Sequence, residues 1–559
     1  MSFQRAAAAI FLIMIPTASV LGAGCMMGRY EPSQSGFTSE KIKLPLALNW
    51  EYTASKYDNN PAAPVVADGV CYFACGDRIY AVDVETGNYK WKYPSEAALG
   101  GFVKATPVVC GGKLYFGASD GNLYCLNATT GVFEWAYQMR GAIRCAPVIV
   151  DGVIYVGADD NSLYAISCES GDLMWKPFTA NDDISIGVAV GNGVIVVSCM
   201  DGYCYGIAAA CGKLKWIYRL PSAPIKTSPI IVENIAIIAV GDTVYGLNLR
   251  SGQLKWSHKL ESEANATPAA VGRDVFIPCR NRKIYAFTST GRQLVQKWTQ
   301  PVDFGAIPMS SPIIANDTLI CTGSKGVVAA YSIEDGALRW RYACAASPIN
   351  TPGSDFTDAS CSATVAEGVL LILTDDGVLH CFAPSAPDNV APEAVQLRPS
   401  NGVAISGVPP IKFSAVLYDV GSGVDFSTAT LSLDGQTVNS EIVVENSMIT
   451  FQTEVGGPGK SVRPLSDGVH KVQVTAKDYF GNQLTKEWFF VASSAIPPPK
   501  RTTVPVDSGK KTREPKRRSY SPPTTPGGPT APQPTGPESP PPPPPPSPSP
   551  PFSPPGPAY

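Results

Sequence analysis

The chain has 559 residues, of which 44 are Lys or Arg and 47 are Asp or Glu, so its formal net charge is −3. A balance this close to neutral argues against a strongly basic protein, the class in which nucleic-acid binding is expected. Only three histidines are present, His258, His380 and His470, and no CxxC pair occurs among the 15 cysteines, so a zinc site is not expected.

The first 24 residues predict an export signal. Arg5 supplies a short positive region, and residues 6–20 form an apolar run too short to span a bilayer. The segment that ends at Cys25 resembles a lipoprotein processing site, which implies cleavage before Cys25 and a lipid on its sulfur. Ordinary secretion is the alternative. Either outcome places the protein in the periplasm or at the cell surface, with residues 25–43 as an N-terminal linker.

An even ladder of tryptophans dominates the next part of the chain. Successive members are about 40 to 44 residues apart, which is the period of a four-stranded propeller blade. The ladder consists of Trp50, Trp91, Trp135, Trp175, Trp216, Trp256, Trp298 and Trp340. Six copies share one pattern: a small residue, a glycine six positions later and a tryptophan four beyond that. These glycines are Gly87, Gly131, Gly171, Gly212, Gly252 and Gly336.

The same repeat predicts how the blades are built and closed. Short β-forming segments such as residues 78–83 precede glycine-containing turns, and the glycine leaves flat backbone against which an indole can pack. One copy, Ala286 to Trp298, has an altered spacing and predicts a reshaped turn. The last repeat ends without a tryptophan, whereas Trp50 has no repeat before it. We therefore expect the strand around Trp50 to complete an eighth blade and close a ring over residues 44–384.

These copies resemble the PQQ-like repeat, a WD40/YVTN-like propeller family whose docking motif is Ala-x-Asp-x-x-x-Gly-x-x-x-Trp. The resemblance implies an all-β, eight-bladed propeller. Among such proteins, the chain is similar to the lipoprotein propeller of the outer-membrane β-barrel assembly machinery in its minimal repeats and N-terminal anchoring. That similarity implies a monomeric, non-catalytic envelope scaffold that binds envelope proteins or cell-wall polymers. The segments after the propeller depart from this relative.

A second β domain follows the propeller. After a linker at residues 385–392, alternating strands with turn signals predict a β-sandwich over residues 393–494, which is similar to bacterial immunoglobulin-like domains. Asp419, Ser422 and Asp425 are candidate Ca²⁺ ligands there. Their oxygens fall short of the 6–8 that calcium takes, so turns are the preferred interpretation and no metal site is predicted.

The remaining residues, 495–559, are too rich in proline to form a core and predict a disordered tail. Six Lys and Arg residues lie between Lys510 and Arg518. We expect this cluster to be solvated, with contact to an acidic polymer or an anionic membrane surface as the alternative.

An oxidoreductase is the alternative function, because quinoprotein dehydrogenases share the repeat. Their resemblance implies PQQ above a tryptophan, Ca²⁺ held by carboxylates and amides, an Asp base and often an adjacent cysteine pair, all in long insertions. The repeats here are close to minimal length, and no adjacent pair exists. The loop carboxylates Asp182–Asp183 and Asp355 with Asp358 are explained by turns. His258 and His380 lie inside repeat strands, so we predict no catalytic residue and no cofactor, with PQQ and Ca²⁺ only under the alternative.

Most cysteines are expected to act as small hydrophobic residues. Cys125 and Cys381 occupy the small-residue position of the repeat. Cys71 with Cys75, or Cys199 with Cys204, are disulfide candidates, but sequence alone does not determine the pairing.

Overall fold

The computed structural model describes residues 25–54, 61–220, 225–344, 358–454 and 464–498. The predicted signal and residues 499–559 of the predicted tail lie outside the described residues. The chain divides into the units Met1–Pro499 and Lys500–Tyr559, and every described residue belongs to the first. Within these ranges, two 3₁₀ turns, η1 (Ser324–Gly326) and η2 (Val444–Asn446), are the only helical elements, so the all-β prediction is confirmed. No helix among the described residues is long and apolar enough to cross a membrane.

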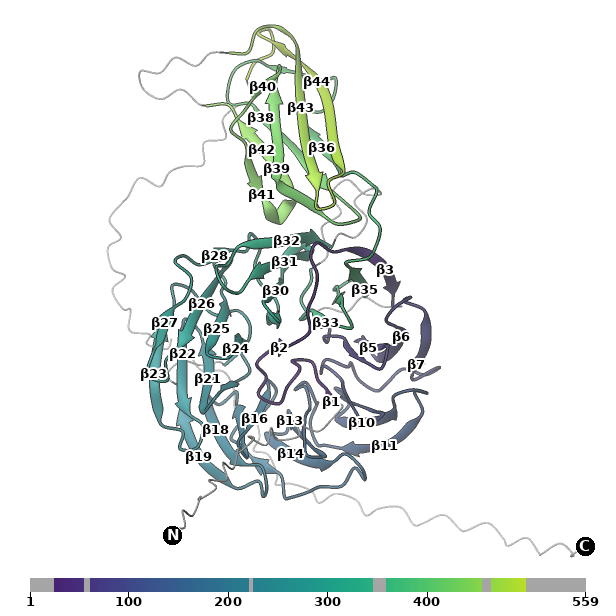
Figure 1. Cartoon of the computed structure of the whole chain (residues 1–559), viewed down its shortest axis with the longest axis vertical. Helices are drawn as coiled ribbons and strands as arrows, with labels where there is room; N and C mark the ends of the chain where they lie inside the picture. Colours follow the sequence, from purple (N-terminus) through teal and green to yellow (C-terminus); the bar gives the residue numbers. More distant parts are fainter. Residues whose placement is uncertain (1–24, 55–60, 221–224, 345–357, 455–463, 499–559) are drawn as a thin grey trace, which may run out of the picture. The chain divides into compact units, whose positions relative to one another are not determined.

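Eight antiparallel sheets surround a common axis, and the first three strands of each sheet follow one another in the chain (Figure 1). The first four sheets are β4 (Val65–Ala67), β5 (Val70–Cys75), β6 (Arg78–Asp83) and β7 (Tyr89–Tyr93); β8 (Val108–Cys110), β9 (Lys113–Gly117), β10 (Asn122–Asn127) and β11 (Phe133–Gln138); β12 (Val148–Val150), β13 (Val153–Ala158), β14 (Ser162–Ser167) and β15 (Phe178–Thr179); and β16 (Val188–Gly191), β17 (Val194–Ser198), β18 (Tyr203–Ala208) and β19 (Leu214–Arg219).

The next four sheets are β20 (Ile230–Val232), β21 (Ile235–Val240), β22 (Thr243–Asn248) and β23 (Leu254–Lys259); β24 (Ala269–Val271), β25 (Asp274–Pro278), β26 (Lys283–Ser289) and β27 (Leu294–Gln296) with β28 (Val302–Asp303); β29 (Ile313–Ala315), β30 (Thr318–Thr322), β31 (Val327–Ser332) and β32 (Leu338–Ala343); and β33 (Thr364–Ala366), β34 (Val369–Leu373), β35 (Val378–Ala383) and β3 (Ala47–Thr53). The middle strands are almost fully buried because neighbouring sheets pack face to face, whereas outer strands alternate between buried and exposed residues.

The eighth sheet joins both ends of the propeller sequence. Its outer strand, β3, pairs with β35, and Trp50 lies opposite Cys381. The register matches the first sheet, where Trp91 lies opposite Ala81. The N-terminal strand therefore takes the place of the tryptophan strand that the last repeat lacks, as the sequence predicts, and the edge of β35 is covered.

Six of the eight docking tryptophans lie on a glycine of the following sheet. A Cβ on Gly87 would lie 2.6 Å from Trp50 Cδ2, and Trp50 Nε1 donates to Val84 O at 3.1 Å. The glycine also has φ +70, so both its missing side chain and its backbone conformation suit this position. The other pairs are Trp91–Gly131, Trp135–Gly171, Trp175–Gly212, Trp216–Gly252 and Trp298–Gly336.

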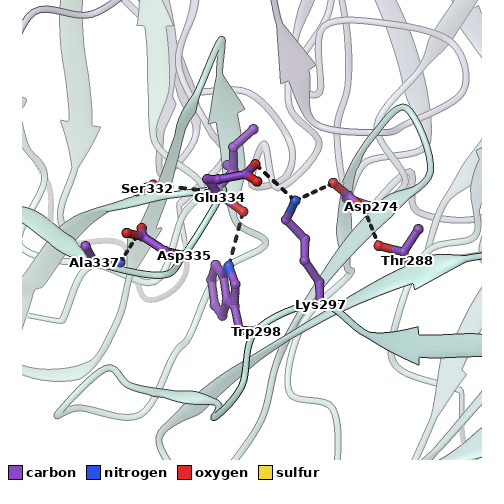
Figure 2. A network of polar contacts seen from close by, with 9 residues as sticks. Asp274, Thr288, Lys297, Trp298, Ser332, Glu334, Asp335 and Ala337 are labelled. Carbon is purple, nitrogen blue, oxygen red and sulfur yellow. Dashed lines mark hydrogen bonds and ion pairs between the residues drawn. The ribbon is translucent and has the colours of Figure 1, made fainter.

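The altered repeat of the sixth sheet has a reshaped turn, as expected. Its outer strand is divided into β27 and β28, and no atom lies within 4 Å of where a Gly291 side chain would begin. Trp256 of the fifth sheet consequently lacks this glycine contact, and its Nε1 has no hydrogen-bond partner. Trp298 still docks by donating to Ile333 O at 3.1 Å, and beside it Lys297 Nζ lies 2.9 Å from Asp274 Oδ2 and 3.4 Å from Glu334 Oε2 (Figure 2).

The residues after the propeller form two sheets that enclose a separate core. One sheet orders β36 (Glu393–Arg398), β38 (Lys412–Tyr418), β42 (Met448–Gln452) and β41 (Glu441–Val443); the other orders β37 (Ala404–Ser406), β44 (Gln483–Ser493), β43 (Gly468–Asp478), β39 (Val424–Leu433) and β40 (Gln436–Thr437). Phe413, Leu431, Trp488 and Phe490 are buried between them. This arrangement is a β-sandwich, and its likeness to immunoglobulin-like domains stays a prediction.

Candidate functional site

An N-terminal strap, residues 25–38, occupies the propeller axis at the level of the inner strands. Its short strands β1 (Cys25–Met26) and β2 (Phe37–Thr38) pair with β8 and β29 (Figure 1). Between them the strap accepts backbone hydrogen bonds from three inner strands. These bonds are Val190 N to Pro32 O at 2.8 Å, Ile231 N to Ser33 O at 2.9 Å and Ala270 N to Ser35 O at 2.8 Å. The segment predicted as a linker is therefore an ordered closure of the axis.

A buried arginine and tyrosine fix the strap. Arg29 donates to Gln34 O at 2.9 Å and to Pro268 O at 2.5 Å, and burial lowers the pKa of its guanidinium to about 10. Tyr30 Oη accepts from Val365 N at 2.8 Å, and burial raises the pKa of this phenol. The strap thus contacts the sixth and eighth sheets through side chains as well as backbone.

Cys25, the predicted lipidation residue, forms a disulfide with Cys110 at the end of β8. One sulfur atom cannot carry both a disulfide and a thioether-linked lipid, so the two outcomes exclude each other. Lipidation of Cys25 stays a prediction. Neither disulfide considered from the sequence is formed, since Cys71, Cys199 and Cys204 are free thiols.

The residues that precede the inner strands surround an open polar cavity of about 300 Å³, which we call the axial mouth. Three cations line it: Lys104, Arg144 and Lys226. The rest of its polar wall consists of one amide and hydroxyls, namely Asn265, Thr106, Ser228, Thr267, Ser310, Ser311, Ser360 and Ser362. Among the described residues that line the mouth there is no carboxylate and no tryptophan.

Repeat register explains why these side chains converge. Lys104, Arg144, Lys226 and Asn265 each lie three residues before the proline that opens an inner strand. Because every sheet starts at the same end of the axis, this one repeat position faces the mouth from sheet after sheet. The register of the repeat is the sequence signal for this position, because the same offset from a proline recurs at all four residues.

Hydrogen bonds between sheets hold the wall of the mouth. Ser228 N donates to Thr267 Oγ1 at 2.9 Å, Ser228 Oγ donates to Ile186 O at 3.1 Å, and Asn265 Nδ2 donates to Pro308 O at 2.5 Å. Arg144 is oriented by Asp159, whose Oδ2 lies 2.6 Å from Nε. The wall is therefore a fixed frame, while the charged ends remain accessible: the side chain of Arg144 is 55% exposed.

The acidic residues weighed from sequence do not line the mouth. Asp182 and Asp183 lie in a loop near Asp159, where burial and these neighbouring carboxylates raise the pKa of Asp183. Asp358 Oδ1 accepts from Lys325 N at 2.7 Å, and Asp355 lies outside the described residues.

The two propeller histidines also lie apart from the mouth. His258 packs against Phe287 with ring centroids 4.7 Å apart. His380 contacts Glu51 through Nδ1 at 2.8 Å and Thr374 through Nε2 at 3.2 Å. The structure brings neither of them to the axis with a nucleophile.

The residues of the mouth can be tested against PQQ, the cofactor that the repeat name implies. A quinoprotein site needs an indole beneath the cofactor and carboxylates for Ca²⁺ and proton abstraction. The described residues that line the mouth include no indole and no carboxylate. Six of the docking tryptophans pack against glycines of neighbouring sheets instead. This wall does not fit PQQ chemistry.

The matched relatives fall into two groups, an outer membrane assembly factor and several alcohol dehydrogenases. The outer membrane protein assembly factor BamB of Burkholderia pseudomallei is 26% identical over 309 residues, which is 50% of this chain and 78% of that protein. The quinohemoprotein alcohol dehydrogenase of Comamonas testosteroni is 37% identical over 98 residues, 16% of this chain. The match covers only 14% of that enzyme's length. This chain also covers less than a fifth of the length of each of the other matched dehydrogenases.

Solved structures support the fold. The quinohemoprotein alcohol dehydrogenase ADHIIG of Pseudomonas putida aligns with a TM-score of 0.53 at 12% identity, covering 70% of this chain and 83% of that one. A computationally designed protein, Ika8, aligns with a TM-score of 0.50 at 13% identity, covering 59% of this chain and 98% of its own.

The family model described as outer membrane protein assembly factor BamB matches residues 47–138, 75–230, 178–306 and 232–407. Together these matches run through all eight sheets and cover more than half of the chain. The chain therefore belongs to the PQQ-repeat family that carries this description.

Proposed function

We propose that the protein is a non-catalytic scaffold of the cell envelope whose axial mouth binds an acidic segment of another envelope protein. The composition of the mouth carries the proposal: three cations and a ring of hydroxyls, with no lining carboxylate among the described residues. Homology to BamB over half of the chain supports an envelope location and protein partners.

Like charges gathered at one opening create a positive potential that attracts and orients an anionic partner. Each contact is exposed and contributes little by itself, roughly 0.2–1 kcal/mol. The affinity must therefore come from several contacts at once, and it must fall as salt screens them. Because the strap crosses the axis along the inner strands and contributes no residue to the mouth, we expect the partner to enter from the side away from the strap.

A PQQ-dependent oxidoreductase is the second candidate, and the short, higher-identity matches to alcohol dehydrogenases favour it. The mouth lacks the groups that such chemistry uses, so we expect no turnover. The purified protein, incubated with PQQ and Ca²⁺, is assayed for alcohol oxidation with an artificial electron acceptor. Turnover that depends on PQQ would contradict the scaffold proposal.

Binding is tested separately with a fluorescent hexaglutamate peptide followed by anisotropy. The variant K104S/R144S/K226S removes the cations of the mouth, and K213S/K215S/K255S removes three exposed lysines on or next to the outer strands β19 and β23 as the matched control. We expect the first variant to lose about tenfold in affinity or more, and the control to bind like the wild type. Equal loss in both variants would show that only overall charge matters. A preference for an acidic polysaccharide over the peptide would assign the mouth to wall polymers instead.

A further inference from the structure

Three aspartates from distant segments meet beside the sandwich. Asp388 comes from the linker, Asp419 follows β38 and Asp478 ends β43. Each offers a carboxylate oxygen within 4.8 Å of the other two, and the residues are only 8%, 5% and 3% exposed. We call this group the aspartate cluster.

Backbone and amide hydrogens orient most of its oxygens. Asp388 accepts from Val390 N and Ser422 N, and Asp478 accepts from Phe480 N and from both nitrogens of Asn482. Such bonds fix the carboxylates but add no positive charge.

Asp419 is the exception within the cluster. Its Oδ2 accepts from Gly421 N at 3.1 Å and from Gly423 N at 2.7 Å, whereas its Oδ1 is buried and has no partner. The hydroxyl of Ser422, which is fully buried, has no partner either. Two buried oxygen atoms, one in the cluster and one next to it, thus lack a partner, and a buried polar atom without a partner destabilises the folded state.

The charge of the cluster is likewise uncompensated. No lysine, arginine or histidine nitrogen in the described part of the chain lies within ion-pair distance of any of the three carboxylates. Buried carboxylates require a cation, a proton or a metal ion. The turn is also shaped for close approach, because a Cβ on Gly421 would lie 2.4 Å from the Asp388 carboxylate.

We propose that Asp388, Asp419 and Asp478 bind one Ca²⁺ ion, with Asp419 Oδ1 as a direct ligand. An all-oxygen site of several buried carboxylates suits Ca²⁺, which accepts irregular coordination by protein oxygens. Mg²⁺ keeps several of its waters and requires a nearly octahedral shell, so it fits a closed protein site less well. Second carboxylate oxygens, the Ser422 hydroxyl and water complete the shell.

The position of the cluster gives the ion a structural role. The loop that follows Asp419 accepts hydrogen bonds from the propeller: Trp340 Nε1 to Ser422 O at 2.9 Å, Tyr342 Oη to Val420 O at 3.1 Å and Leu48 N to Gly421 O at 3.0 Å. An ion held by Asp388 and Asp419 therefore fixes both the linker and this loop.

Isothermal titration of the EGTA-stripped full chain with Ca²⁺ tests the proposal. We expect one site with a Kd between about 10⁻⁵ and 10⁻³ M, the range of extracellular calcium modules and weaker sensors. D419N keeps the shape of the side chain but removes a charge, and it is expected to weaken binding about tenfold or more. D425N is the matched control. It also removes one carboxylate charge, but Asp425 lies outside the cluster, and its carboxylate accepts hydrogen bonds from Ser427 N and Ser427 Oγ.

Hydrogen–deuterium exchange of the wild type gives a readout that needs no variant. Ca²⁺ should slow exchange in peptides that cover residues 385–392, 417–425 and 476–484, and leave the blade peptides unchanged. Absence of saturable binding at millimolar Ca²⁺, or equal weakening by D425N, would overturn the proposal. Equal affinity for Mg²⁺ would overturn the assignment to calcium.

Discussion

The axial mouth and the aspartate cluster each gather three like charges, yet they differ in solvent exposure. Arg144 at the mouth is 55% exposed, whereas each aspartate of the cluster is less than a tenth exposed. Water still reaches the Arg144 guanidinium beside its Asp159 partner, so solvent lowers the cost of holding positive charge at the mouth. The buried carboxylates lack that solvent and need a counter-charge within the folded protein. Three like charges are therefore consistent with a partner-binding surface at the exposed mouth and with a structural ion site at the buried aspartate cluster.

The largest effect is expected behind the mouth, at the disulfide that holds the strap. C110S removes a link that closes a loop of 85 residues, and we expect a loss of about 2–4 kcal/mol in the free energy of unfolding. Denaturant unfolding under oxidising conditions measures it. Mass spectrometry of the mature wild type supplies the control, because a lipid on Cys25 would exclude the disulfide and make C110S nearly neutral.

The next effect concerns pH and separates the cluster from the mouth. Burial, together with the charges of Asp388 and Asp478, raises the pKa of Asp419 to about 6 from its usual 3.8. The folded state then binds a proton more tightly than the unfolded state, so stability is greatest below pH 4 for this group and falls as pH rises to about 6. In EGTA we expect a loss on the order of 2 kcal/mol between pH 4 and 7.

Two variants sharpen this pH prediction. D419N removes the titrating group and should abolish the loss, whereas K104S/R144S/K226S should retain it in full. Urea unfolding at a series of pH values measures both. A pH dependence that D419N leaves intact would place the titrating group elsewhere.

A smaller effect is expected from salt. Raising salt from about 50 to 500 mM should weaken peptide binding at the mouth by about tenfold, because exposed charges are screened over a Debye length. Ca²⁺ binding at the cluster should change by less, since buried pairs are screened much less. Anisotropy and calorimetry in the same buffers compare the two sites directly, and an equal salt dependence would remove the distinction between them.

The smallest effect is the stability of the mouth variant itself. Its three substitutions lie at partly or fully exposed positions outside the strands, so each should change the free energy of unfolding by less than about 0.5 kcal/mol. Thermal unfolding measures this change. A large loss of stability would mean that these cations support the fold, which would contradict their role in binding a partner.

Sequence predicted the propeller well because its signals are local and repeated. The spacing of Gly87 and Trp91 recurs along the chain, and the absence of a final tryptophan correctly indicates pairing of β3 with β35. The mouth residues also follow the repeat, since Lys104 and Arg144 occupy the same repeat position. That these side chains converge becomes evident only when the sheets are arranged around an axis.

The aspartate cluster and the strap could not be predicted in the same way. Asp388 and Asp478 are 90 residues apart in the printed sequence and share no motif, whereas Asp425, a candidate from sequence, lies outside the cluster. The strap depends on backbone hydrogen bonds that the carbonyls of Pro32 and Ser33 accept, which no side-chain pattern reports. Contacts of this kind are set by the tertiary arrangement and not by local sequence.

Photo-crosslinking from the mouth in cells tests the scaffold account most directly. A photoreactive residue is placed at Ser311, which lines the mouth, and a second at the exposed Lys255 on β23 as the control. We predict a crosslink from position 311 to an acidic segment of an envelope protein, identified by mass spectrometry and lost in K104S/R144S/K226S. A partner captured from position 255 but not from position 311, or a crosslink at 311 that survives loss of the three cations, would contradict the account.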